Sequence, residues 1–227
     1  GIYLANKNHD SLMNTQDFNP GYETDYYGDI GLGQCQGAII LPVPDALDKY
    51  YCFSTSSEII TTNAGIDAEA LELRYSMIDM TLDNGLGGII EGFKKINVIN
   101  DTLSRGTITA CKHANGRDWW LLCHGYNDSS FYKLLITPEG IKGPYVQEIG
   151  IITSTYDQYV SARFSPDGSK YVWMENRDTL NFFDFDRCTR ELRNPVMAIT
   201  PAEDYVTTGS AISSNSTYIY KEILFVI

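Results

Sequence analysis

A chain of 227 residues with 43% apolar and 20% charged residues can bury a substantial core, which argues against an intrinsically disordered protein. Its formal net charge of −12 would repel a phosphate backbone, and no apolar run approaches the ~18 residues of a membrane span. We therefore expect a folded protein without nucleic-acid partners and without membrane insertion.

Short apolar runs separated by Gly, Pro, Asn and Asp recur along the whole chain, and they predict β-strands of roughly 5 to 8 residues. In chain order these runs are GAIILPVP, KYYCFST, LRYSMIDMTL, DWWLLCHGY, SSFYKLLIT, KYVWMEN, LNFFDF and STYIYKEILFVI. Only IDAEALELRY (66–75) has a helix-like composition, and its second half also alternates as a strand would. We expect residues 61–71 to form a loop or a one-turn insertion in an all-β fold.

The turns between these runs repeat. FSPDGSKYVW (164–173) aligns without a gap with KHANGRDWWL (112–121) and with ISSNSTYIYK (212–221), and VPDALDKYYC (43–52) is an earlier copy. The last three copies are roughly 50 residues apart, a spacing that indicates a repeat architecture.

Each copy is followed by a second pair of apolar runs, so one unit holds two antiparallel hairpins. Four antiparallel strands per unit is the plan of a β-propeller blade, and such blades bury their faces only by stacking around an axis. The sequence therefore predicts part of a β-propeller, with about four four-stranded blades. The expected blades are 1–92 with an insertion near 55–71, 93–148, 149–198, and an incomplete 199–227.

The densest group of chemically capable side chains is CKHANGRDWWLLCH (111–124). Asn115-Gly116 is a strong hairpin signal, and a short turn there would pair His113 with Asp118 and Cys111 with Trp120. Alternation along the strands then puts two groups on opposite faces. One face carries Cys111, His113, Trp120, Leu122 and His124, and the other carries Trp119 and Cys123.

This register separates the thiols and imidazoles that a tetrahedral zinc site would bring together. Neither cysteine has the flanking base or the helix N-terminus that would activate a nucleophile. We therefore predict no catalytic, cofactor-binding or metal-binding residue, and no cofactor. The same polar and aromatic side chains are expected to make contacts between blades, or to touch a ligand at a propeller face. They are His113, Asn115, Arg117, Asp118, Trp119, Trp120 and His124.

Two other motifs suggest sites but lack the necessary context. GDIGLGQCQG (28–37) is rich in glycine, yet no helix follows to bind a phosphate, so it is expected to be a loop. DMTLDNGLGG lacks the ligand spacing of a calcium loop and is expected to be a turn. The five cysteines have no framework spacing and are interpreted as buried thiols.

Several strings together resemble the propeller domain of large secreted proteins of Bacteroidetes, over roughly residues 14–221. These strings are NPGY…GQCQGAIILPVP, YSMIDMTLDNGLGG, HANGRDWW, FSPDGSKYV and FFDFDRCTRE. Many members carry a sorting domain for type IX secretion or are associated with gliding motility, so the resemblance implies an extracellular or cell-surface location. The family's propellers are longer than this chain. The family usually has Gly where this chain has Arg190, so either Arg190 takes a left-handed conformation or the turn differs.

From the resemblance we expect a non-catalytic extracellular or cell-surface scaffold for protein or glycan interaction, within a larger secreted or surface protein. Its partners would include the remaining blades or other domains of a longer chain. One alternative is a lactonase-like hydrolytic propeller with a metal in its channel, where three or more carboxylate or amide oxygens would surround a cation. A second alternative is a structural component of a secretion or motility assembly.

Overall fold

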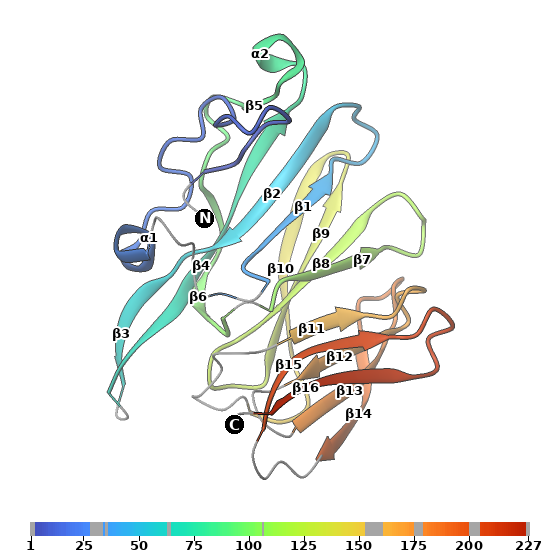
Figure 1. The fold of residues 1–227 in the computed structure, drawn as a ribbon. Helices are drawn as coiled ribbons and strands as arrows, with labels where there is room; N and C mark the ends of the chain where they lie inside the picture. Colours follow the sequence, from blue (N-terminus) through green and yellow to red (C-terminus); the bar gives the residue numbers. More distant parts are fainter. Residues whose placement is uncertain are drawn as a thin grey trace. The chain divides into compact units, whose positions relative to one another are not determined.

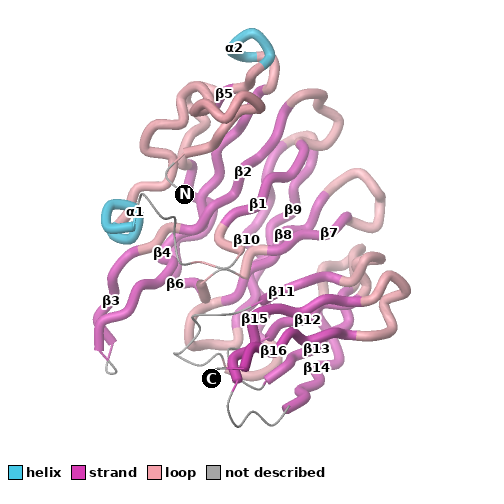
Figure 2. Tube along the Cα trace, in the orientation of Figure 1, coloured by secondary structure: helices cyan, strands magenta, loops and turns pink. Residues whose placement is uncertain are grey.

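The computed structural model describes residues 3–27, 34, 36–62, 65–105, 107–152, 161–174, 179–199 and 205–225. Strands make up nearly all of its regular structure (Figures 1 and 2). The chain divides into two compact units, Gly1–Gly33 with Gly37–Leu103, and Gln34–Gln36 with Ser104–Ile227. The predicted fold class, an all-β partial propeller of antiparallel blades, is confirmed.

The first unit is one antiparallel sheet built around the long strand β4. Its elements are α1 (Tyr22–Tyr27), β1 (Ala38–Pro42), β2 (Lys49–Thr55), β3 (Glu58–Thr62), β4 (Gly65–Asp79), α2 (Leu82–Gly85), β5 (Gly88–Ile89) and β6 (Ile96–Leu103). β1 pairs with β2, and β2 pairs with the second half of β4. β5 and β6 pair with β4 as well. Leu12, Phe18, Cys52, Ile78 and Ile89 form a buried cluster in this unit.

Two expectations for this unit are wrong. Residues 61–71 are not a loop or a helical turn, because β3 pairs antiparallel with the first half of β4 and extends the sheet as a hairpin. The β-branched run of β3 offers a strand partner, and this pairing overrides the helix-like composition of the segment. The first blade also does not end at residue 92, because β6 pairs with β4 and the sheet continues to Leu103.

The second unit contains three further sheets, with strand orders β10-β9-β8-β7, β11-β12-β13-β14 and β15-β16. Their strands are β7 (Thr109–Lys112), β8 (Trp119–His124), β9 (Ser130–Thr137), β10 (Gly140–Glu148), β11 (Ser161–Phe164), β12 (Lys170–Met174), β13 (Thr179–Phe185), β14 (Leu192–Ile199), β15 (Tyr205–Ile212) and β16 (Ile219–Phe225). We call these the second, third and fourth sheets.

The first strand of each sheet lies nearest to the neighbouring sheets. β11 lies against both β7 and β15, and the hydroxyl oxygens of Ser161 and Ser210 are 3.2 Å apart. The last strands, β10 and β14, are mostly exposed and lie at the edges of their sheets (Figure 1). Each carries a proline, Pro144 or Pro195, which a strand tolerates at an edge because proline cannot donate a ladder hydrogen bond.

The hairpin turns of the three sheets are built alike, as the sequence alignment predicts. In each turn the fourth residue has a left-handed φ (76°, 72° and 57°) and donates its amide to the carbonyl of the first residue. The pairs are Gly116 with His113 at 2.9 Å, Gly168 with Ser165 at 2.8 Å, and Ser216 with Ser213 at 2.9 Å. Segments 112–121, 164–173 and 212–221 are therefore structural repeats.

The second and third sheets pack face to face through a largely aromatic layer. Trp120, Leu122 and Phe131 of the second sheet lie in one buried cluster with Tyr171 and Trp173 of the third. Burial of side chains of this size stabilises a fold by roughly 2 to 3 kcal/mol each.

Candidate functional site

The hairpin of β7 and β8 has the register that the sequence predicts. Cys111 lies opposite Trp120, and the amide of His113 donates to the carbonyl of Asp118 at 2.9 Å. Because side chains alternate along a strand, Cys123 points to the opposite face from Trp120 and Cys111. The two thiols therefore do not converge.

The polar side chains of this turn hydrogen-bond to one another. Asn115 Oδ1 accepts from the amides of Arg117 and Asp118, at 3.0 Å each, and Asn115 Nδ2 donates to Asp118 Oδ2 at 2.9 Å. Arg117 Nε donates to Asp118 Oδ1 at 2.7 Å, and this hydrogen bond is the main reason that the pKa of Asp118 is lowered. These contacts give the turn a structural role, and a ligand-contacting role for Asn115, Arg117 and Asp118 stays a prediction.

Three of the predicted residues lie in the layer between the second and third sheets. Trp120 Nε1 donates to the carbonyl of Arg187 at 2.8 Å, as expected for a contact between blades. The rings of His113 and Trp120 have centroids 5.7 Å apart. His124 is fully buried, and burial lowers its pKa to about 4.

Cys52, Cys111 and Cys123 are buried thiols as expected, whereas Cys188 is exposed, so the expectation is wrong for Cys188. Burial raises the pKa of Cys111 to about 12, and it raises the pKa of Cys123 further. Neither thiol would be ionised at neutral pH, so neither is an activated nucleophile. Among the described residues, no group of three or more His, Cys, Asp or Glu side chains could hold a metal ion.

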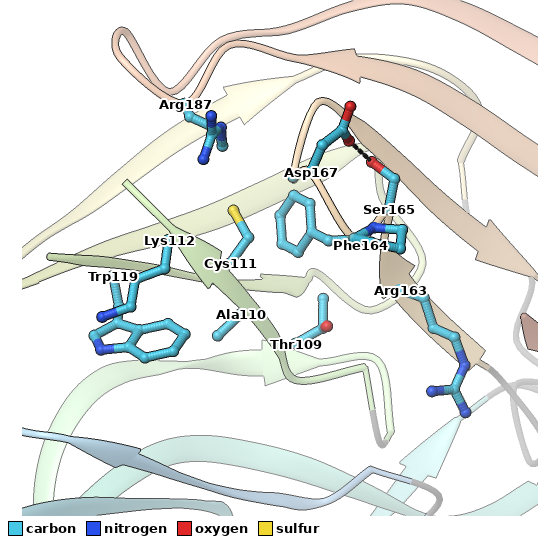
Figure 3. Close-up of a pocket in the computed structure, with 12 residues that line it drawn as sticks. Thr109, Ala110, Cys111, Lys112, Trp119, Arg163, Phe164, Ser165, Asp167 and Arg187 are labelled. Carbon is cyan, nitrogen blue, oxygen red and sulfur yellow. Dashed lines mark hydrogen bonds between the residues drawn. The ribbon is translucent and has the colours of Figure 1, made fainter. Parts of the chain in front are cut away.

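A pocket of ≈ 360 Å³ lies beside this hairpin, between β7, β11 and the turns that follow β11 and β13 (Figure 3). Three cationic side chains line it, although the chain as a whole carries a net charge of −12. Its lining residues are Thr109, Ala110, Cys111, Lys112, Trp119, Arg163, Phe164, Ser165, Pro166, Asp167, Gly168 and Arg187. Arg163 and Arg187 are seen at opposite ends of it, with Cys111 and Phe164 between them.

Arg187 is held in place by the neighbouring sheet. Its carbonyl accepts hydrogen bonds from Trp120 Nε1 at 2.8 Å and from the amide of Ala114 at 3.2 Å. Its side chain crosses Gly168, where an added Cβ would lie only 2.6 Å from Arg187 Cδ and 3.4 Å from Cys111 Cβ. Glycine at 168 therefore allows the left-handed φ of the turn and leaves room for the side chain of Arg187.

The turn that carries Arg187 is fixed at its other end as well. Asp186 Oδ1 accepts from the amides of Cys188 and Thr189 at 2.9 and 3.1 Å. Arg190 has φ 68°, so the left-handed alternative stated for it is correct. The ammonium of the buried Lys133 donates to the Arg190 carbonyl at 2.9 Å, and burial lowers the pKa of Lys133 to about 8.

Two charged groups in the pocket have fixed partners. Lys112 Nζ lies 3.8 Å from the centroid of the Trp119 ring and donates to the carbonyl of Arg117 at 3.0 Å; burial lowers its pKa. Asp167 accepts from the Ser165 hydroxyl at 2.6 Å and from the amide of Ser169 at 3.0 Å. These hydrogen bonds hold the pKa of Asp167 far below its usual value, so the carboxylate stays ionised at neutral pH.

Of the seven predicted site residues, only Trp119 lines this pocket. The three cations were missed because Lys112, Arg163 and Arg187 come from β7, from β11 and from the turn after β13. Arg187 lies inside the string DFDRCT, and nothing in that string marks it as a site residue. Sequence spacing gives no signal that these three side chains meet.

No described helix is long and apolar enough to cross a membrane. No family model matches the chain, and no curated protein matches it either. The resemblance to the secreted propellers of Bacteroidetes therefore stays a prediction.

Solved structures similar to the chain include three proteins that are named for a lactonase activity. A Bacteroides fragilis protein assigned as a 6-phosphogluconolactonase is 15% identical over 80% of this chain and 50% of its own, with a TM-score of 0.44. A Bacteroides uniformis protein with the same assignment is 12% identical over 82% and 60%, with a TM-score of 0.42. The periplasmic gluconolactonase of Pseudomonas aeruginosa is 10% identical over 82% and 66%, with a TM-score of 0.38. The chain thus spans between 50% and 66% of the length of these proteins.

These comparisons correct the expected function. All three proteins are named for a lactonase activity, which overturns the interpretation of the chain as a non-catalytic scaffold for protein or glycan interaction. The hydrolytic alternative is taken up below as a proposal. The alternative of a structural part in a secretion or motility assembly gains no support from them.

Proposed function

We propose that the chain is part of a hydrolytic propeller that acts on lactones of small anionic sugar acids. The pocket between the second and third sheets would hold the anionic group of the substrate. The observation that carries the proposal is the placement of Lys112, Arg163 and Arg187 around one pocket of an acidic protein.

The charges of the pocket support an anionic ligand. A guanidinium can bind a phosphate or carboxylate with two parallel hydrogen bonds, which gives it both strength and direction. Arg187 is suited to this because its backbone is held by two hydrogen bonds from the second sheet. The ionised Asp167 shares the pocket and would repel an anion bound close to it, so we assign the anionic group to the arginines.

The remaining lining suits a compact polyhydroxylated ring. Trp119 and Phe164 offer apolar faces, while Thr109 and Ser165 offer hydroxyl groups. A volume of ≈ 360 Å³ is within the range of sites for small molecules.

In the proposed reaction, water adds to the lactone carbonyl carbon and the ring C–O bond breaks. The products are a hydroxy acid in its carboxylate form and one proton. We assign binding and orientation of the anionic substrate to the pocket residues, and we route no step through a metal or through Cys111, whose thiol is protonated at neutral pH.

Proton release measures this reaction directly. The full chain is incubated with 6-phosphogluconolactone or with gluconolactone, and acidification is compared with spontaneous hydrolysis. Arg187→Ala is expected to raise the KM for the phosphorylated substrate by about 10- to 100-fold and to change the KM for the neutral one much less.

Arg193→Ala is the matched control, because Arg193 follows the same turn but does not line the pocket, and its Nη2 lies 3.7 Å from Asp186 Oδ2. It is expected to leave both KM values within about twofold of wild type. Absence of acceleration with either lactone, or equal effects of the two arginine variants, would refute the proposal.

We also propose that the protein works outside the cytoplasm, in a longer chain whose remaining blades pack against these. The sequence resemblance and the periplasmic name of the Pseudomonas protein support the location. Intact mass of the native protein, together with fractionation of the cells that make it, tests both points.

A further inference from the structure

The layer between the second and third sheets contains a second group of polar side chains, at the end formed by the last residue of β8 and the first residues of β13. His124 ends β8, Trp173 lies in β12, and Asn181 lies in β13. Trp173 and Asn181 are directly opposite on neighbouring strands, so their side chains share one face. The His124 ring stacks on Trp173 with centroids 4.6 Å apart and planes at 13°, so His124 and Asn181 both lie beside Trp173.

These side chains are almost completely removed from solvent. His124, Trp173 and Asn181 are 0%, 1% and 3% exposed. Yet His124 Nε2, Trp173 Nε1 and Asn181 Nδ2 have no hydrogen-bond partner in the part of the chain that is described. Buried polar atoms in folded proteins are nearly always paired, either with protein or with ordered water.

The hydrogen-bonding roles of the three atoms follow from their chemistry. His124 Nδ1 lies 2.7 Å from the carbonyl oxygen of Gly125, so Nδ1 carries the ring proton and Nε2 is an acceptor. Trp173 Nε1 and Asn181 Nδ2 are donors. The burial that lowers the pKa of His124 to about 4 keeps the ring neutral at pH 7.

The two stacked rings do not satisfy each other. The indole N–H and the imidazole lone pair each point outward in the plane of their own ring. Because the two rings are stacked one above the other, the N–H of one cannot point at the lone pair of the other. A cation is also excluded as the partner, because two of the three groups are donors. Two donors and one acceptor match a molecule that accepts two hydrogen bonds and donates one.

We propose that a water molecule is bound between the second and third sheets, accepting from Trp173 Nε1 and Asn181 Nδ2 and donating to His124 Nε2. Three protein partners is the usual number for a buried water. The water would join β8 of the second sheet to β12 and β13 of the third. It would hold the two sheets together at the end of the layer away from the pocket that Lys112, Arg163 and Arg187 line.

Water-selective NMR on the ¹⁵N-labelled full chain tests this site. The indole proton of Trp173 is expected to show a cross-relaxation peak at the water frequency despite its burial. Trp120 is the matched control, because its indole N–H is also buried but donates to the Arg187 carbonyl at 2.8 Å. The indole of Trp120 should show no such peak. Equal behaviour of the two indoles would overturn the proposal.

Two variants separate water from other sources of the signal. Tyr171 lies two residues from Trp173 on the same face, and its hydroxyl proton exchanges with solvent. Tyr171→Phe should keep the Trp173 peak, and loss of the peak in that variant would assign it to the hydroxyl and reject the water. His124→Phe should abolish the peak, and its persistence would also count against the site. If His124→Phe does not fold, the wild type and Tyr171→Phe still decide the question.

Discussion

The two ends of the layer between the second and third sheets use their polar groups in opposite ways. At the pocket end, Arg187 is held through its backbone, and its side chain passes over a glycine into an open cavity. At the other end, His124 and Trp173 stack in the buried interior, and their Nε2 and Nε1 atoms have no partner among the described residues. The packed end can therefore hold the two sheets in place while the pocket end presents charged side chains.

The largest effect should come from breaking the packed end. Trp173→Ala removes a side chain that is 1% exposed and should lower the free energy of unfolding by about 3 to 5 kcal/mol. Urea denaturation measures this loss. Trp119→Ala at the pocket end should cost clearly less, because Trp119 is only partly buried. Similar losses for the two tryptophans would mean that the ends do not differ in packing.

The next-largest effect should be on how the free energy of unfolding depends on pH, because the buried His124 lies at the packed end. The folded-state pKa of His124 is about 4 and lies below its usual 6.5, so unfolding takes up a proton between these values. Stability should therefore fall as the pH drops from about 6.5 to 4, by at most about 3 kcal/mol from this group. His124→Phe should flatten this part of the profile. A profile that is the same with and without His124 would contradict the assignment.

The smallest effect should come from a pair of glycines in equivalent turns. Gly116 and Gly168 have φ of 76° and 72°, so Gly→Ala at either position should cost about 1 kcal/mol of stability. An added Cβ meets nothing within 4 Å at Gly116, but at Gly168 it lies 2.6 Å from Arg187 Cδ. Only Gly168→Ala should therefore weaken the binding of an anionic ligand, which isothermal titration calorimetry measures. Equal ligand affinity in the two variants would show that Gly168 does not position Arg187.

The sequence predicted the features that depend on local chemistry. Asn115-Gly116 specified a turn and its register, and the same pattern located the turns at Gly168 and Ser216, because each turn is closed by hydrogen bonds within a few residues. The strand pairing of residues 61–71 and the place of β6 in the first blade were missed, since both depend on pairing with β4. The strand signal of 61–71 was also hidden by its helix-like composition.

The candidate site was beyond prediction for a related reason. The second sheet contributes Lys112 to the pocket and the third contributes Arg163 and Arg187, so the three cations line one pocket only through the packing of two sheets. The pattern favoured CKHANGRDWWLLCH because its polar groups are close together in sequence. Most of those groups instead stabilise the turn or lie in the layer between the sheets.

The most direct test of the cationic pocket is the binding of 6-phosphogluconate, the product of the proposed reaction, measured by calorimetry at low salt. We expect Arg187→Ala to weaken binding by at least about tenfold, and Arg193→Ala to leave it within about twofold. Equal affinity of wild type and Arg187→Ala, or no binding by the wild type, would contradict the account.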